Sequence, residues 1–382
     1  MAQDDVVLKD CPRLSDVENM LRILNRLGCG ADRRGNEIHI RPAEAQSWEI
    51  PEDLSGLLRS SIFLLGPVIA RFGRAAVAYP GGCEIGLRPI DLHLKGLRAL
   101  GVTICEAHGR ILCEANCLRG APVVLDFPSV GATENIMMAA CLAKGTTTIY
   151  NAAMEPEIAD LARFLCRMGA KISGAGTGTV CITGVPALSG AVYRPMPDRI
   201  AAGTFLAAAA CAGGEVRIDG ARPEDMRSVI EKFREAGCGI EEGEESLTIA
   251  RSGPLKALEI STQPYPGFPT DLQSLFLAAA CFAQGTSVIV ENLFENRFGL
   301  AAQLRRMGAE ISVRGRTAIV RGGRLFGTRV VAGDLRAGAA LAVAGLGAEG
   351  YTEIEGVDRI DRGYDRLEDD LASLGAKIWR VD

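Results

Sequence analysis

A helix-ending pattern recurs six times along the 382-residue chain and divides it into units of similar length. Each copy has five residues, begins with Leu or Phe and ends in glycine, as at 24–28 and 304–308. The six glycines lie 67 to 73 residues apart: Gly28, Gly101, Gly169, Gly237, Gly308 and Gly375. A glycine in this place supplies the left-handed residue that ends an α-helix. The pattern therefore predicts six related units.

Five units also contain an Ala-rich segment that is apolar on nearly all sides, which predicts a buried helix. These helices are expected at 58–73 (the least regular), 132–145, 201–213, 272–285 and 336–350. Strand-forming runs follow four of them, at 146–150, 215–218, 286–290 and 352–354. After five of the caps we expect a short strand, a polar turn and a second strand, and after the sixth cap one strand.

The resulting unit, strand–helix–strand–helix–strand–strand, is long enough to be a small α/β fold rather than one turn of a solenoid. Three such βαβαββ units around shared buried helices make one domain, so six units predict two similar domains. Pro195 and Pro197 interrupt the pattern, which predicts domains at 1–196 and 197–382. We expect the substrate site in the cleft between them.

The first unit is incomplete at its start. In the other units the Ala-rich helix ends 23 to 28 residues before the cap, and this distance counted back from Gly28 reaches the beginning of the sequence. Residues 4–9 can form the second strand of this unit and residues 17–27 its surface helix. We expect that its opening strand and buried helix are absent, so that Met1 is an internal start or the start of a shortened form.

Composition narrows the class of protein. The net charge of −5 and the lack of a dense Lys/Arg block argue against a nucleic-acid surface. Twelve cysteines without a CxxC pair, with only three histidines, argue against structural zinc and fit a reducing cytoplasm. The longest uncharged apolar runs, 62–70 and 204–214, are too short to cross a membrane, and no signal-peptide pattern is recognised.

Cys83 stands in a glycine-rich stretch at 80–93, between Gly82 and Gly86, with Arg88 five residues further on. Glycines let a loop expose the sulfur, and a nearby guanidinium favours the thiolate. Two interpretations stay open: a reactive thiol on a loop, or an incidental cysteine in a Gly-rich hairpin.

Single arginines stand at the loop ends of different units. Their planar guanidinium groups match the oxygens of carboxylates and phosphates. Each alone could be an ordinary surface arginine, but their recurrence favours an anion site. The set is Arg59, Arg88, Arg297, Arg336 and Arg362.

Other polar residues stand where helices should begin. Asp271 precedes a buried helix at an N-cap position and is either a cap or a general base. Ser129 opens another buried helix, whose N–H groups could face a phosphate. Glu155 and Glu157 are expected to cap or order the adjacent surface helix.

Residues 80–93 resemble the catalytic loop of the UDP-N-acetylglucosamine 1-carboxyvinyltransferases, the enolpyruvyl transferases that begin peptidoglycan precursor synthesis. Further stretches are similar to other signatures of that family, and the match covers essentially the whole chain. These stretches are 129–138, 193–200, 268–271, 295–298 and 360–364. The family fold, an inside-out α/β barrel of two domains with three repeated units each, agrees with the repeats.

The resemblance implies transfer of enolpyruvyl from phosphoenolpyruvate to the 3′-hydroxyl of UDP-N-acetylglucosamine, with release of phosphate. It implies a cytoplasmic enzyme without a metal, an organic cofactor or an obligate protein partner. Cys83 would protonate the enol carbon and react with fosfomycin, and Asp271 would deprotonate the sugar hydroxyl. The implied phosphoenolpyruvate ligands are Arg88, Arg297, Arg336 and Arg362. The implied UDP-sugar ligands are Arg59, Arg88, Pro89, Ile90, Asp91, Leu92, Ser129, Val130, Gly131, Asp271 and Leu293.

One part of the family pattern is not found. The family carries a Lys-Asn pair at the start of its first buried helix, in the segment that we expect to be absent. Two other interpretations therefore remain. One is an enolpyruvyl transferase with another acceptor, such as shikimate 3-phosphate or a nucleotide, and the other is a non-catalytic nucleotide-sugar-binding homologue.

Overall fold

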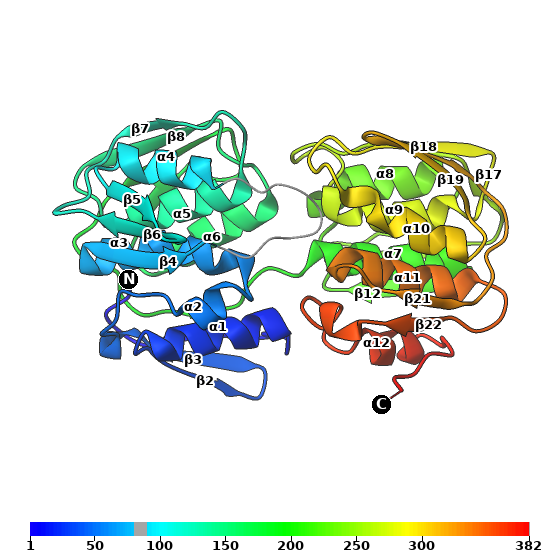
Figure 1. Cartoon of the computed structure of the whole chain (residues 1–382), viewed down its shortest axis with the longest axis horizontal. Coiled ribbons are helices and arrows are strands. Elements are labelled where there is room, and N and C mark those ends of the chain that lie inside the picture. The colour runs from blue at the N-terminus through cyan, green and yellow to red at the C-terminus, as the bar shows by residue number, and fades with distance from the viewer. Residues whose placement is uncertain (80–89, 382) are drawn as a thin grey trace. The chain divides into compact units, whose positions relative to one another are not determined.

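The computed structural model describes residues 1–79 and 90–381, and these form two compact units. The N-terminal unit ends at Met196 and the C-terminal unit begins at Pro197. Each unit combines helices with small sheets (Figure 1), which confirms the predicted α/β class.

The N-terminal unit contains three sheets, with strand orders β11-β1-β3-β2, β4-β6-β5 and β7-β8-β10-β9. Its strands are β1 (Val6–Leu8), β2 (Gly30–Arg34), β3 (Glu37–Arg41), β4 (Arg74–Ala78), β5 (Thr103–Ala107), β6 (Arg110–Glu114), β7 (Pro122–Val124), β8 (Thr146–Tyr150), β9 (Lys171–Ser173), β10 (Thr179–Thr183) and β11 (Val192–Tyr193). Its helices are α1 (Ser15–Arg26), α2 (Glu52–Ser55), α3 (Leu65–Phe72), α4 (Asp91–Ala99), α5 (Val130–Ala140) and α6 (Pro156–Arg167). The buried helices α3 and α5 pack against each other, and a 3₁₀ turn, Arg59–Leu64, replaces the first half of the irregular helix expected at 58–73.

The C-terminal unit contains sheets with strand orders β12-β14-β13, β16-β18-β20-β19, β15-β17 and β21-β22. Its strands are β12 (Gly214–Asp219), β13 (Gly239–Glu242), β14 (Ser246–Arg251), β15 (Leu255–Lys256), β16 (Glu259–Ser261), β17 (Ala283–Gln284), β18 (Thr286–Val290), β19 (Glu310–Arg314), β20 (Thr317–Arg321), β21 (Arg329–Val331) and β22 (Glu353–Glu355). Its helices are α7 (Arg199–Ala212), α8 (Arg227–Glu235), α9 (Thr270–Ala280), α10 (Leu300–Arg306), α11 (Leu335–Gly347) and α12 (Leu367–Ser373). In the part of the chain that the structure describes, no helix is long and apolar enough to span a bilayer.

The six predicted glycine caps are confirmed. Their φ angles lie between 90° and 102°, in the left-handed region where a side chain would be strained. They close α1, α4, α6, α8, α10 and α12 with the same pair of hydrogen bonds. In the first copy, Gly28 N–H donates to the carbonyl of Asn25 at 3.0 Å, and Cys29 N–H donates to that of Leu24 at 2.9 Å. The repeat in sequence is thus a repeat in backbone geometry.

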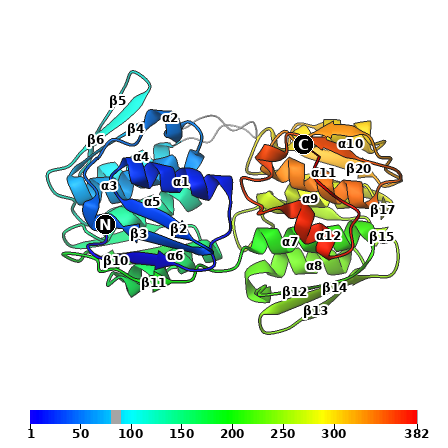
Figure 2. The same ribbon diagram turned by 90° about the horizontal axis from the view of Figure 1, so that it is seen from below.

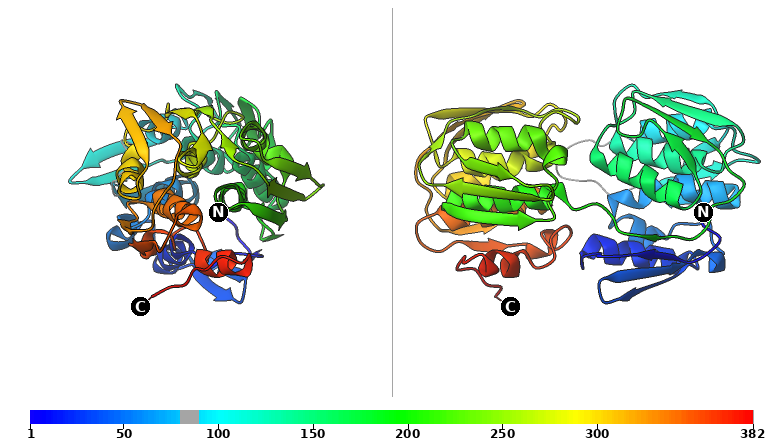
Figure 3. Two further views of the ribbon diagram at one scale, coloured as in Figure 1. Left: turned by 90° about the vertical axis from the view of Figure 1, so that its right-hand side faces the viewer. Right: turned by 180° about the vertical axis from the view of Figure 1, so that it is seen from behind.

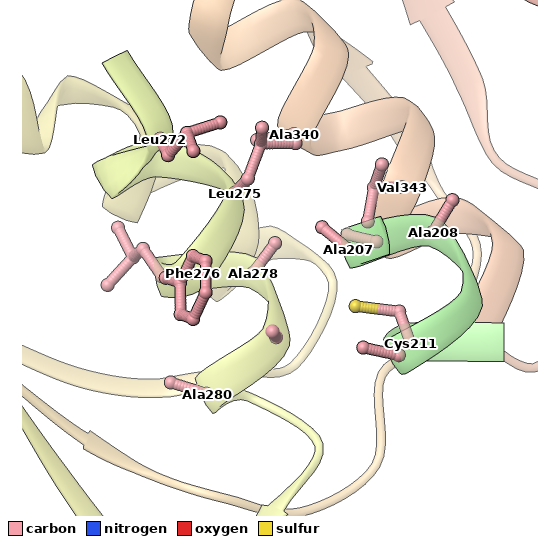
Figure 4. Packing of buried hydrophobic residues seen from close by; sticks show 14 of the residues in the cluster. Ala207, Ala208, Cys211, Leu272, Leu275, Phe276, Ala278, Ala280, Ala340 and Val343 are labelled. Carbon is pink, nitrogen blue, oxygen red and sulfur yellow. The ribbon is translucent and has the colours of Figure 1, made fainter. Parts of the chain in front are cut away.

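Three Ala-rich helices form the centre of the C-terminal unit. α7, α9 and α11 contact one another pairwise, and small side chains such as Ala207 and Ala340 let them approach closely (Figure 4). Phe276 of α9 is fully buried and packs on Phe233 and Phe268, with ring centroids 4.5 and 4.9 Å away. Sheet β12-β14-β13 covers α7 and α8 on one side (Figures 2 and 3). This packing fixes the N-termini of α9 and α11, where the site residues lie.

Two buried helices end five residues earlier than predicted. α5 ends at Ala140 and α9 at Ala280, each five residues before the glycine that was expected to end it. Gly145 and Gly285 have φ angles of 96° and 105° and stand directly before β8 and β18. These glycines therefore turn the chain into a strand and do not cap the helix.

The strand expected after the sixth cap is wrong for residues 376–381, which contain no strand. In other units the first strand after the cap pairs with the strand that returns beside it, as β9 does with β10 and β19 with β20. Residues 376–381 have no such returning strand among the described residues, and Trp379 is 63% exposed. Strand propensity without a strand to pair with is therefore not enough to form a strand at residues 376–381.

Candidate active site

Asp271 lies in the first turn of α9, beside an arginine from a neighbouring loop. Pro269 occupies the N-cap in an extended conformation, so Asp271 is the second residue of the helix and the predicted N-cap position is wrong. Its Oδ1 accepts a hydrogen bond from Nη2 of Arg297 at 2.7 Å. The carboxylate is therefore engaged by another side chain, and the N-cap residue Pro269 makes no side-chain cap hydrogen bond.

Arg297 is a buried cation in the 3₁₀ turn Arg297–Gly299, and its side chain is only 3% exposed. Nη2 also donates to the carbonyl of Thr270 at 3.3 Å, and the guanidinium lies 5.8 Å from the centroid of the Phe294 ring. A cation out of water needs such compensation. Arg297 therefore holds both the backbone and the carboxylate of the first turn of α9.

Arg336 approaches the same carboxylate from the first turn of α11. Its Nη2 lies 3.7 Å from Oδ2 of Asp271, and its Nη1 lies 3.4 Å from the hydroxyl of Tyr364. Burial works to lower the pKa of Arg336, but the charge of Asp271, with Tyr364 and Asp198, outweighs burial and raises it above its usual value. Arg336 is therefore a permanent positive charge beside Asp271.

Tyr364 connects Arg336 to another buried helix. Its hydroxyl forms a 2.7 Å hydrogen bond with Oγ1 of Thr204 on α7. Arg362, two residues before Tyr364, is half-buried. The structure thus brings Asp271, Arg297 and Arg336 together, while Thr204 and Tyr364 were not predicted as site residues. The signals for Tyr364 were its place two residues after a candidate arginine and within the signature-like stretch 360–364.

A second group of predicted site residues gathers in the N-terminal unit. Arg59 begins the 3₁₀ turn, Ile90 to Leu92 begin α4, and Ser129 to Gly131 begin α5. α5 contacts both α4 and the 3₁₀ turn, so the three segments that carry these residues are neighbours. Ser129 is the N-cap of α5, and its hydroxyl accepts a 3.3 Å hydrogen bond from Ala132 N–H.

His93, which the sequence did not single out, packs under this group. Its Nδ1 lies 3.1 Å from Nδ2 of Asn135, and its ring stacks on Phe63 with centroids 5.7 Å apart. Burial, with a smaller contribution from Arg59, lowers the pKa of His93 to about 4. A neutral imidazole therefore supports the start of α5. The sequence signal for His93 was its position directly after Asp91 and Leu92, two predicted ligands of the UDP-sugar.

The remaining predicted residues fall in two places. Leu293 lies in the loop after β18, where its N–H donates to the Glu291 carboxylate at 2.8 Å. Cys83, Arg88 and Pro89 lie outside the described residues.

Comparisons with known proteins all find carboxyvinyltransferases, although these are named for two different acceptors. The family model described as EPSP synthase (3-phosphoshikimate 1-carboxyvinyltransferase) matches residues 1–371. UDP-N-acetylglucosamine 1-carboxyvinyltransferase 2 of Caldanaerobacter subterraneus subsp. tengcongensis is 50% identical over 98% of this chain and 90% of its own length. The UDP-N-acetylglucosamine 1-carboxyvinyltransferase of Nitratidesulfovibrio vulgaris is 47% identical over 100% of this chain and 91% of its own length.

Solved structures show the same fold. The enolpyruvyl transferase NikO from Streptomyces tendae has a TM-score of 0.89 at 25% identity, covering 98% of this chain and 90% of that one. The EPSP synthase from Acinetobacter baumannii has a TM-score of 0.74 at 19% identity, covering 100% and 92%. With near-full-length relatives at about half identity, the chain belongs to the UDP-N-acetylglucosamine 1-carboxyvinyltransferases, within the family described as EPSP synthase.

Proposed function

We propose that this protein transfers the enolpyruvyl group of phosphoenolpyruvate to the 3′-hydroxyl of UDP-N-acetylglucosamine and releases phosphate. The observation that carries the proposal is the near-full-length relationship to enzymes named for this reaction. A cytoplasmic enzyme of this activity would make the first committed precursor of peptidoglycan.

In the proposed mechanism Asp271 is the general base. It accepts the proton of the sugar hydroxyl while the oxygen bonds to C2 of phosphoenolpyruvate, and Cys83 delivers a proton to C3. The resulting tetrahedral adduct then loses a proton from C3 and phosphate from C2, which restores the double bond. The support for this role is that a carboxylate with two guanidinium groups beside it stands at the start of a buried helix.

The arginines supply the positive charge that phosphoenolpyruvate requires. Arg336, Arg362 and Arg88 would bind its phosphate and carboxylate, with Arg297 behind Asp271. A guanidinium can donate two parallel hydrogen bonds to such groups, and it stabilises charge that develops on the leaving phosphate. In the described structure Arg336 faces Asp271 and Tyr364, so binding of the substrate anion would draw its guanidinium onto the substrate.

The N-terminal group would bind the nucleotide sugar. The start of α5 at Ser129 to Gly131 offers backbone N–H groups and the positive end of a helix to a diphosphate. Arg59 adds a positive charge beside it. The stretch from Arg88 to Leu92, Leu293 and Asp271 are the other proposed ligands of the nucleotide sugar.

A second acceptor has a specific observation in its favour. The matching family model is described by the shikimate 3-phosphate reaction, although the near-full-length relatives at 47–50% identity are named for UDP-N-acetylglucosamine. Mass spectrometry of phosphoenolpyruvate incubations with each acceptor separates the two. We expect an enolpyruvyl adduct on the nucleotide sugar. An adduct on shikimate 3-phosphate alone would contradict the proposal, and binding of the nucleotide sugar without any adduct would indicate a non-catalytic homologue.

A further inference from the structure

A buried carboxylate that the proposed mechanism does not use contacts Thr270, the residue directly before Asp271. Glu291 follows β18 and is 1% exposed. A carboxylate taken out of water is costly unless hydrogen bonds replace its hydration. Its retention at the edge of the candidate site therefore needs a reason.

Four donors converge on Glu291 from three segments. Oε1 accepts from the hydroxyl of Thr262 at 2.9 Å, from Leu293 N–H at 2.8 Å and from Phe294 N–H at 3.2 Å. Oε2 accepts from the hydroxyl of Thr270 at 2.9 Å. Both oxygens of Glu291 accept in this set, and the two N–H groups can only donate.

Three of these donors belong to the segments that carry the Asp271–Arg297 pair. Thr270 directly precedes Asp271, and its carbonyl accepts from Arg297. Phe294 places its ring beside the guanidinium of Arg297. One end of Glu291 thus fixes the first turn of α9, and the other fixes the loop that leads to Arg297.

The corresponding place in the N-terminal unit shows that the fold alone does not require this carboxylate. Sheet β7-β8-β10-β9 has the same arrangement as β16-β18-β20-β19, and Asn151 follows β8 as Glu291 follows β18. Among the described residues, the side chain of Asn151 has one hydrogen bond, from Nδ2 to the carbonyl of Leu125 at 2.9 Å. The additional bonds of Glu291 are directed at the site.

We propose that Glu291 is a positioning residue that sets the geometry of the Asp271–Arg297 pair and thereby the orientation of the catalytic base. This rests on the proposed function, in which Asp271 takes the proton of the sugar hydroxyl. The proposed role does not require Glu291 to touch the substrate. It acts through Thr270 on one side and through Leu293 and Phe294 on the other.

Two variants of Glu291 and one matched control test this. Glu291→Ala removes all four hydrogen bonds. Glu291→Gln keeps a carbonyl oxygen for the two N–H groups and the Thr262 hydroxyl, while its NH₂ can donate to Thr270. The control is Ser287→Ala, because Ser287 is also buried on β18 and its hydroxyl accepts from Leu258 N–H at 3.0 Å, remote from Asp271 in the hydrogen-bond network.

We expect Glu291→Ala to lower kcat by about 10- to 100-fold, since a misplacement of about 1 Å can cost that much. The kcat of Glu291→Gln should stay within about threefold of the wild type, because its hydrogen bonds are retained. Ser287→Ala should lose about as much Tm as Glu291→Ala but should also keep its kcat within about threefold. If Glu291→Ala matches Ser287→Ala in kcat, or if Glu291→Gln is as slow as Glu291→Ala, the proposal is overturned.

Crystal structures of the variants give a reading that does not depend on turnover. In Glu291→Ala the 2.7 Å contact between Oδ1 of Asp271 and Nη2 of Arg297 should open, and in Glu291→Gln it should persist. An unchanged contact in Glu291→Ala would overturn the positioning role. A wild-type protein without transferase activity would instead overturn the proposed function, and the crystal structures would still decide the role of Glu291.

Discussion

Oδ1 of Asp271 accepts a 2.7 Å hydrogen bond from Nη2 of Arg297, and the two residues come from different elements of the C-terminal unit. Arg297 is buried, whereas the carboxylate side chain of Asp271 is 42% exposed. The pair therefore has one anchored partner and one that solvent or a substrate can reach. This asymmetry is what a positioned general base requires.

Asp271→Asn should lower kcat by about 10²- to 10⁴-fold, because the amide cannot accept the hydroxyl proton. The amide oxygen can still accept from Arg297, but this buried cation loses its counter-charge, so Tm should also fall. Steady-state phosphate release and differential scanning calorimetry measure the two effects. Asp16→Asn, which alters a first-turn carboxylate in α1, is the control and should be fully active. An Asp271→Asn enzyme as fast as this control would exclude Asp271 as the base.

His93 predicts a specific dependence of stability on pH. Its pKa is about 4 in the folded protein and about 6.5 when unfolded, so the unfolded chain binds more protons between these values. The stabilising contribution of neutral His93 is thus complete above pH 6.5 and falls as the pH drops toward 4, by about 3 kcal/mol in total. Between pH 6.5 and 4, urea unfolding should show a smaller loss of unfolding free energy for His93→Gln than for the wild type, because the amide does not titrate. Parallel curves for the two proteins would contradict the lowered pKa.

Gly131→Ala should destabilise the start of α5. A Cβ there would lie 2.5 Å from Cε1 of Phe63 and 3.1 Å from Cε1 of His93. Overpacking of this kind costs about 1–3 kcal/mol in the free energy of unfolding. Gly178→Ala in the same unit, where a Cβ meets nothing within 4 Å, is the control. Adding Phe63→Leu to Gly131→Ala should restore part of the lost free energy of unfolding. Equal stability of Gly131→Ala and Gly178→Ala would refute the close packing.

Alkylation should distinguish Cys83 from the other cysteines. Burial raises the pKa of Cys113, Cys141 and Cys281 to about 12, which leaves these thiols protonated near neutral pH. Cys105 and Cys166 are exposed and serve as accessible controls. Brief iodoacetamide treatment followed by peptide mass spectrometry should label Cys83 first, and fosfomycin should protect it. Equal labelling of Cys83, Cys105 and Cys166 would contradict an activated thiol.

Most of the fold could be predicted from short patterns in the sequence. The glycine caps and the strands β8 and β18 were predicted correctly because a left-handed glycine and an alternating strand leave signals within a few residues. The end of α9 at Ala280 and the unpaired segment after Gly375 were not, because they depend on neighbours far away in the chain.

The candidate site divides in the same way. Arg297, Arg336 and Asp271 could be selected from their places at the ends of units. That Arg297 is buried against Asp271, and that Tyr364 joins Arg336 to Thr204, depends on contacts between residues 26 to 160 positions apart. A single sequence contains no direct signal for such pairs.

The most direct measurement is the release of phosphate from phosphoenolpyruvate by the purified chain, with UDP-N-acetylglucosamine, with shikimate 3-phosphate and with no acceptor. Enolpyruvyl transfer to the nucleotide sugar predicts phosphate release only with UDP-N-acetylglucosamine, and its loss in Asp271→Asn. Release that needs no acceptor, or that shikimate 3-phosphate alone supports, would contradict the proposed function.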